Sequence, residues 1–161
     1  MSIATVTEAR QYLTFQLGEE VFALDVHKVR EVLDFTSITK IPRTPEFMRG
    51  VINLRGSVVP VVDLRLSFGM AATEKTVNTC IIVVEVQLEG ETAIIGALAD
   101  SVEEVIDLEP EHIQPAPRIG ASLRTDFIKG MGARDSGFVM ILDIDRVFSA
   151  EDLAALEAGR Q

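Results

Sequence analysis

The sequence has 161 residues, 47% hydrophobic and 25% charged, which supplies enough apolar side chain for a folded core and argues against a disordered chain. The formal net charge is −10, from 15 Lys and Arg against 25 Asp and Glu, so the average field repels phosphate backbones and anionic lipid headgroups. With no Trp and a single Tyr to stack on bases, we expect no nucleic-acid partner.

The N-terminal segment carries no export pattern. It lacks a basic region followed by an apolar one, and no apolar run approaches the roughly 20 residues that cross a bilayer. The single cysteine, Cys80, precedes the apolar run 81–84, where a thiol packs as a small hydrophobe. We therefore expect a cytoplasmic protein in a reducing compartment, with no direct membrane insertion.

The chain opens with a predicted β-hairpin. Residues 12–17 alternate toward a turn at 18–20, and residues 21–24 resume the extended pattern. A short helix or bend, a Pro-containing connector and a Gly-punctuated hairpin follow, until strand periodicity is lost near 68–78. Another hairpin, rich in β-branched residues, then spans 81–98.

The second half of the chain repeats the first, with blocks recurring at offsets of 73 and then 80 residues. The change of offset predicts seven extra residues in the second copy's connector, around 110–123, because loops absorb such changes easily. The matched segments are 29–34 with 102–107, 47–50 with 127–130, and 61–64 with 141–144.

The repeat predicts a mainly β fold of two small five-stranded barrels, because closure would hide strand edges that an open sheet exposes. We expect one domain over 11–158, with lobe one at about 11–70 and lobe two at about 78–148. Any exchange of strands between the lobes is left open. A short C-terminal helix is predicted at about 150–158, after Ser149 as N-cap.

Groups capable of catalysis are scattered along the sequence. His27 and His112 lie far apart in charged surroundings, which is typical of surface histidines and not of metal ligands. Asp63, Asp143 and Asp145 close apolar strands, but the chain has no GxxxxGK[ST] loop, so we interpret them as strand-end caps. We expect no catalytic residue, metal or cofactor.

The two copies differ at one turn. The first has Asn53-Leu54-Arg55-Gly56 where the second has residues 133–136, Ala-Arg-Asp-Ser, so the tetrad is a candidate for a duty specific to lobe one. The alternative is that Asn53 and Gly56 supply turn geometry while Arg55 is solvated or pairs with an acid such as Glu31.

Segments 29–32, 41–56 and 59–65, taken in order, resemble the CheW family of chemotaxis coupling proteins, and residues 96–107, 113–117 and 127–130 extend the resemblance over roughly 11–158. The resemblance implies two SH3-like barrels around a shared core. It also implies a non-catalytic adaptor that couples transmembrane chemoreceptors to the histidine kinase CheA. Such adaptors dock on the kinase's regulatory domain and grip receptor hairpin tips in the groove between the lobes, and we also expect ring or array assembly.

The resemblance also nominates interface residues. Positions tied to receptor and kinase coupling match Val29, Glu31, Gly50, Asn53 and Arg55, and the other side of the groove matches Gly96 and Val105. Structural alternatives stay open for several of them: Gly50 as a turn glycine, Val29 and Val105 as core residues, and Glu31 with Arg55 as a stabilising ion pair.

Three other functions stay open. The same fold could serve another two-component pathway, such as motility or surface sensing, and only the partner would distinguish it. An enzyme in a barrel cleft lacks a convergent set of titratable residues. A nucleic-acid-binding barrel is opposed by the net charge.

Overall fold

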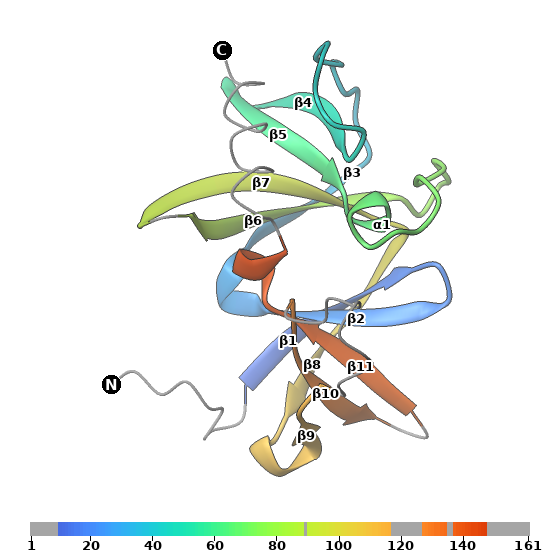
Figure 1. Cartoon of the computed structure of the whole chain (residues 1–161), viewed down its shortest axis with the longest axis vertical. Helices are drawn as coiled ribbons and strands as arrows, with labels where there is room; N and C mark the ends of the chain where they lie inside the picture. Colours follow the sequence, from blue (N-terminus) through green and yellow to red (C-terminus); the bar gives the residue numbers. More distant parts are fainter. Residues whose placement is uncertain (1–9, 89, 117–126, 135–136, 148–161) are drawn as a thin grey trace.

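The structure is a computed structural model that describes residues 10–88, 90–116, 127–134 and 137–147 (Figure 1). The predicted C-terminal helix at 150–158 lies outside the described residues, as do residues 117–123 of the predicted insertion around 110–123. Arg118 and Arg124 of this connector lie outside them as well.

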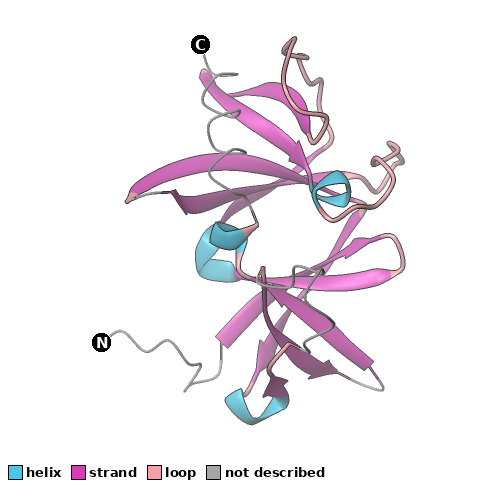
Figure 2. Cartoon of the chain, viewed as in Figure 1, coloured by secondary structure: helices cyan, strands magenta, loops and turns pink. Residues whose placement is uncertain are grey.

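The described chain is built mostly of strands, joined by tight turns and by longer loops at 35–47 and 68–79 (Figure 2). A short helix, α1 (Leu64–Ser67), follows β5, and 3₁₀ turns occur at Val26–Lys28, Pro110–His112 and Ile144–Arg146. The strands are β1 (Arg10–Leu17), β2 (Glu20–Asp25), β3 (Val29–Asp34), β4 (Met48–Leu54), β5 (Ser57–Asp63), β6 (Cys80–Leu88), β7 (Glu91–Ala99), β8 (Ser101–Leu108), β9 (Ile113–Gln114), β10 (Ile128–Arg134) and β11 (Gly137–Leu142).

The strands form two sheets, which define the two lobes used below. Lobe one is the sheet β3-β6-β7-β5-β4, and lobe two is the sheet β8-β1-β2-β11-β10-β9. The hairpin β1–β2 comes from the start of the chain but joins the later strands through a parallel pairing of β2 with β11. Lobe one is completed in the same way, by parallel pairing of β5 with β7. The sheets therefore exchange strands between the two sequence repeats.

The mainly β, two-lobed fold predicted from the sequence is confirmed, but the expectation of closed barrels is wrong. Each described sheet curls without pairing its first strand with its last, so β3 and β4 remain edges in lobe one and β8 and β9 in lobe two. We call the space between the edges of each lobe its seam. The β3–β4 connector covers part of the β4 edge, because Thr39 pairs with Val51, and charged side chains commonly protect the rest of such an edge.

Alternating strand residues separate the core into three clusters. Odd and even positions of β6 show the pattern, because Ile81 and Val83 face the interior of lobe one while Ile82 and Val84 face a layer between the sheets. Tyr12 and Leu108 belong to the interior of lobe two. The layer between the sheets, which we call the shared core, receives buried side chains from both lobes.

A β-bulge changes the direction of β4 in lobe one and of β10 in lobe two. The β4–β5 register shifts between Met48 and Gly50, so Met48 faces the shared core while Ile52 faces the interior of lobe one. Gly50 has φ +143°, and a Cβ there would lie 2.2 Å from the carbonyl oxygen of Thr39. Lobe two has the same bulge before Gly130. The glycine lets the connector cross the hairpin at close range.

We predict that Gly50→Ala lowers the free energy of unfolding by more than about 3 kcal/mol, because the new Cβ collides with backbone. Gly56→Ala is the control: Gly56 also has positive φ, +89°, but open space around it, so its loss should be about 1 kcal/mol. Urea unfolding followed by circular dichroism measures both. Equal losses in the two variants would contradict the packing role of Gly50.

Candidate docking site

An ion pair spans the seam of lobe one, between β3 and the β4–β5 turn. Arg55 donates from Nη1 to Glu31 Oε1 at 3.3 Å and from Nη2 to Glu31 Oε2. The Arg55 side chain is 70% exposed and that of Glu31 29%. The hydrogen bond from Arg55 lowers the pKa of Glu31, and Glu31 in turn raises the pKa of Arg55. We call this pair the lobe-one clasp.

The turn that carries Arg55 has the geometry of a tight hairpin. Arg55 and Gly56 have φ values of +50° and +89°, as a two-residue type I′ turn requires, and Asn53 Oδ1 accepts a hydrogen bond from Gly56 N at 2.7 Å. The structural alternative weighed for the tetrad is therefore confirmed: Asn53 and Gly56 shape the turn and Arg55 pairs with Glu31. A coupling duty for these residues stays a prediction.

A groove of about 700 Å³ opens beside the lobe-one clasp, and we call it the clasp groove. Val83, Val59 and Ile94 line it and also pack in the interior cluster of lobe one. Arg30 and Arg55 supply charge at its rim, and Val58 is 61% exposed. An apolar floor with a charged rim fits an amphipathic protein segment.

Three of the predicted interface residues are largely structural in position. Val29 lies on β3, half-buried, and packs against the shared core. Gly96 is buried on β7, where it pairs with Val61 and Val83, and a Cβ there would lie 2.8 Å from Ile81 Cγ2. Gly50, described above, supports the hairpin. These residues shape the strands around the groove and offer it little surface.

Val105 lies on the other sheet. It is on β8, 50% exposed, while the residues that line the clasp groove come from lobe one. The structure thus brings Glu31 and Arg55 together but does not place Val105 in the same groove.

Sequence reasoning missed Val32, which is 41% exposed on β3, one residue after Glu31. The repeat carried the signal, because the match of 29–34 with 102–107 aligns Val32 with Val105 and Val29 with Val102. Val29 and Val102 both pack against the shared core, whereas Val32 and Val105 are both exposed. The surface residue that corresponds to Val105 is therefore Val32, not Val29.

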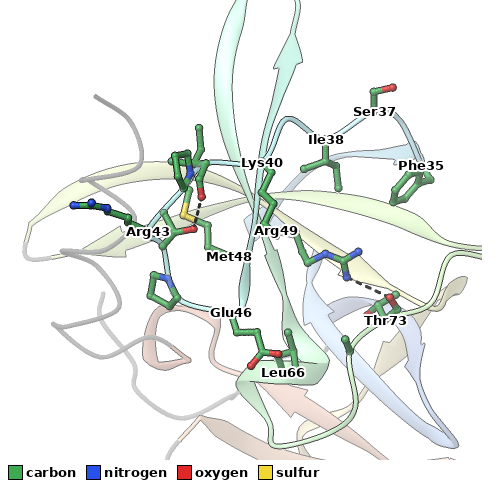
Figure 3. A pocket seen from close by; sticks show the side chains of 15 residues that line it. Phe35, Ser37, Ile38, Lys40, Arg43, Glu46, Met48, Arg49, Leu66 and Thr73 are labelled. Atoms are coloured by element: carbon green, nitrogen blue, oxygen red, sulfur yellow. Dashed lines mark hydrogen bonds between the residues drawn. The ribbon is translucent and has the colours of Figure 1, made fainter.

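A second groove, of about 860 Å³, lies between the β3–β4 connector and the loop after α1 (Figure 3). Arg49 reaches across it and donates to the carbonyl oxygen of Thr73 at 3.2 Å. Arg49 also pairs with the buried Asp63 at 3.0 Å. This network ties the two walls together.

The strand-end aspartates differ in their roles. Asp63 caps α1, since its Oδ1 accepts from Arg65 N at 3.1 Å, and Asp145 Oδ1 accepts from Gln87 N at 2.8 Å. Asp143 makes no capping hydrogen bond and instead lies 3.6 Å from Arg146. The capping interpretation therefore holds for Asp63 and Asp145, which each accept from a backbone N–H group, and not for Asp143.

The remaining candidates lie apart. His27 and His112 are exposed, and Cys80 is partly buried with its thiol 3.2 Å from the carbonyl oxygen of Asn78. Within the described residues, no three His, Cys, Asp or Glu side chains gather in a metal-binding group. No helix in the described part of the chain is long and apolar enough to cross a membrane.

Comparison with known proteins decides the family. The model of the CheW-like domain matches residues 11–152. The chain belongs to the CheW-like domain family. This CheW-like chain is 34% identical over 155 residues to the chemotaxis protein CheW of Klebsiella aerogenes, covering 96% of this chain and 91% of that protein. It is also 34% identical over 146 residues to CheW of Rhizobium meliloti, covering 91% and 92%.

A solved structure agrees with this CheW-like fold. The crystal structure of the scaffolding protein TtCheW from Thermoanaerobacter tengcongensis superposes with a TM-score of 0.78 at 36% identity, covering 89% of this chain and 94% of that one. The family is one of chemotaxis adaptor and scaffold proteins.

We predict that the carboxyl group of Glu31 titrates below the ordinary range of a glutamate, because Arg55 hydrogen-bonds its ionised form. The stability it contributes is present above its unfolded pKa and is lost as pH falls through its folded pKa. Arg55→Gln should raise the midpoint. NMR titration of the side-chain carboxyl carbon measures it.

Arg30→Gln is the matched control, since Arg30 contacts Glu85 at 3.5 Å and not Glu31. A Glu31 midpoint that is unchanged by Arg55→Gln would show that the clasp does not form in solution.

Proposed function

We propose that this protein couples transmembrane chemoreceptors to the histidine kinase CheA, acting in the cytoplasm at membrane-associated receptor arrays and catalysing no reaction. The observation that supports it most is family membership over 11–152, because the related proteins are chemotaxis proteins or a scaffold. The clasp groove adds a surface suited to a protein segment.

The receptor's helical hairpin tip is the proposed occupant of the clasp groove. An amphipathic helix lays apolar side chains into such a groove and leaves its polar face at the rim. Val58 supplies exposed contact area, and Val32 lies on the same strand as Glu31. Arg55, held by Glu31, orients the polar rim. Val105 offers a separate exposed contact on lobe two, while Val29, Gly50, Asn53 and Gly96 hold the strands that shape the surface.

CheA docks through its regulatory domain on the barrel surfaces. The clasp groove is small, and we expect it to give micromolar-class binding of the receptor tip, about −8 kcal/mol. Assembly of many copies into rings or arrays raises the effective affinity without a new contact. Weak individual contacts and strong collective ones suit a scaffold.

Kinase reconstitution tests the proposal. CheA activity is measured with receptor-bearing membranes, with and without the purified protein. Activity that rises only when all three components are present supports coupling. If the protein binds neither partner, the proposed function is wrong. If it binds receptors together with a kinase of another pathway, the adaptor serves motility or surface sensing instead of chemotaxis.

Arg55→Glu should reduce receptor binding about tenfold or more, because it places a second carboxylate beside Glu31 and removes the cation from the rim. Arg146→Glu is the control: Arg146 is similarly exposed, at 67%, but lies in the 3₁₀ turn after β11 and does not line the clasp groove. Sedimentation with receptor membranes over a range of protein concentrations compares them. Equal binding by both variants would remove Arg55 from the receptor contact.

Val58→Asp should weaken receptor binding by roughly tenfold, since it replaces exposed apolar contact area at the groove with a charge. Val77→Asp, in the loop before β6 and 99% exposed, controls for the added charge. The same sedimentation assay distinguishes them. A similar loss in both variants would point to net charge and not to the groove.

A further inference from the structure

Lobe two carries a counterpart of the lobe-one clasp. Arg134, at the end of β10, donates from Nη2 to Glu104 Oε2 and lies 3.6 Å from Glu103 Oε1. Glu104 is the repeat partner of Glu31, 73 residues on. The tetrads at the two turns differ in sequence, yet an arginine from each turn region reaches the equivalent glutamate. We call Glu104 and Arg134 the lobe-two clasp.

The two glutamates are held differently by their own strands. In lobe one, Glu31 pairs through its backbone with Val83 of β6. In lobe two the β1–β8 register shifts between Leu13 and Phe15, and Glu104 has no partner in the ladder. In lobe one Val84 pairs with Val29, and in lobe two Phe15 pairs with Val102, the repeat partner of Val29. Phe15 therefore corresponds to Val84, and the residue before it, Thr14, corresponds to Val83.

Thr14 replaces the missing backbone pairing with its side chain. It is fully buried, and its hydroxyl donates to the carbonyl oxygen of Glu104 at 2.8 Å and accepts from Glu104 N at 3.1 Å. Both backbone groups of the bulged residue are therefore satisfied by one hydroxyl. A valine of the same shape, as Val83 has in lobe one, would leave them without a partner at this position.

We infer that Thr14 is a positioning residue that fixes the bulge of β8 so that Glu104 meets Arg134 and closes the seam of lobe two. The fixed bulge also determines where Val105, the next residue, projects from the sheet. The buried hydroxyl of Thr14 thus fixes the directions in which both Glu104 and Val105 project at this seam. The role is independent of which partners the protein binds.

Thr14→Val tests this role. The readout is across the seam from Thr14: exchange of the Arg134 guanidinium hydrogens, Nη2 among them, and of the β10 amides at Ala133 and Arg134, measured by NMR on the full chain. We expect Thr14→Val to speed this exchange roughly fivefold, the loss of a hydrogen bond of about 1 kcal/mol, and Thr14→Ser to leave it near wild type. Glu104→Gln, at an exposed position, should reproduce the effect without a buried change.

Thr79→Val is the matched control, since Thr79 is also buried and its hydroxyl accepts from Thr76 N at 2.8 Å, in lobe one. Thermal unfolding of both valine variants corrects for a general loss of stability. Faster Arg134 exchange in Thr14→Val alone supports the positioning role. Equal exchange in Thr14→Val and wild type, or equal acceleration by Thr79→Val, overturns it. If Thr14→Val fails to fold, Glu104→Gln still tests the clasp on which the role depends. Arg134 hydrogens that exchange as slowly in Glu104→Gln as in wild type would show that the clasp does not form, and would overturn the role.

Discussion

The shared core is the constraint on which the two-lobed structure depends. Each sheet sends one set of alternating side chains into its own interior and the other set into the layer between the sheets. A stack of Phe15, Phe22, Phe68 and Phe127, with ring centroids 4.7 to 5.9 Å apart, crosses that layer. Since neither lobe covers this face alone, the lobes must fold against each other, and the exchange of hairpins follows from the same need.

Polar contacts refine the arrangement that the apolar layer sets. Lys28 Nζ donates to Asp145 Oδ2 at 3.0 Å, and Arg65 Nη1 donates to Asp100 Oδ2 at 2.7 Å, both near the junction of the lobes. Truncating one buried leucine costs about 2–5 kcal/mol, whereas an exposed ion pair contributes about 0–1 kcal/mol. The clasps therefore matter for where side chains point at the seams more than for the stability of the fold.

Local pattern revealed the strands, and the repeat revealed the architecture. The hairpins expected at 12–24 and 81–98 correspond to β1–β2 and β6–β7, because alternation and Gly turns are local signals. The parallel pairings β5–β7 and β2–β11 join distant segments and leave no period in the sequence. The open seams were missed for a related reason, since closure depends on the geometry of edge strands and not on composition.

Of the candidate docking site, only the ion pair could be predicted from the sequence. Glu31 and Arg55 were named together from the sequence and do pair, but no local pattern in the sequence marks Val58 and Val32 as exposed. Thr14 is a threonine in an apolar strand, and only the register of β1 against β8 shows its contact with Glu104.

Hydrogen exchange followed by mass spectrometry, on the protein alone and in complex with receptor membranes and CheA, tests most directly whether the clasp groove is a docking surface. Our expectation is that complex formation slows exchange in β3 and in the turn at 53–58. Unchanged exchange in both segments, with slowing confined to other surfaces, would contradict it.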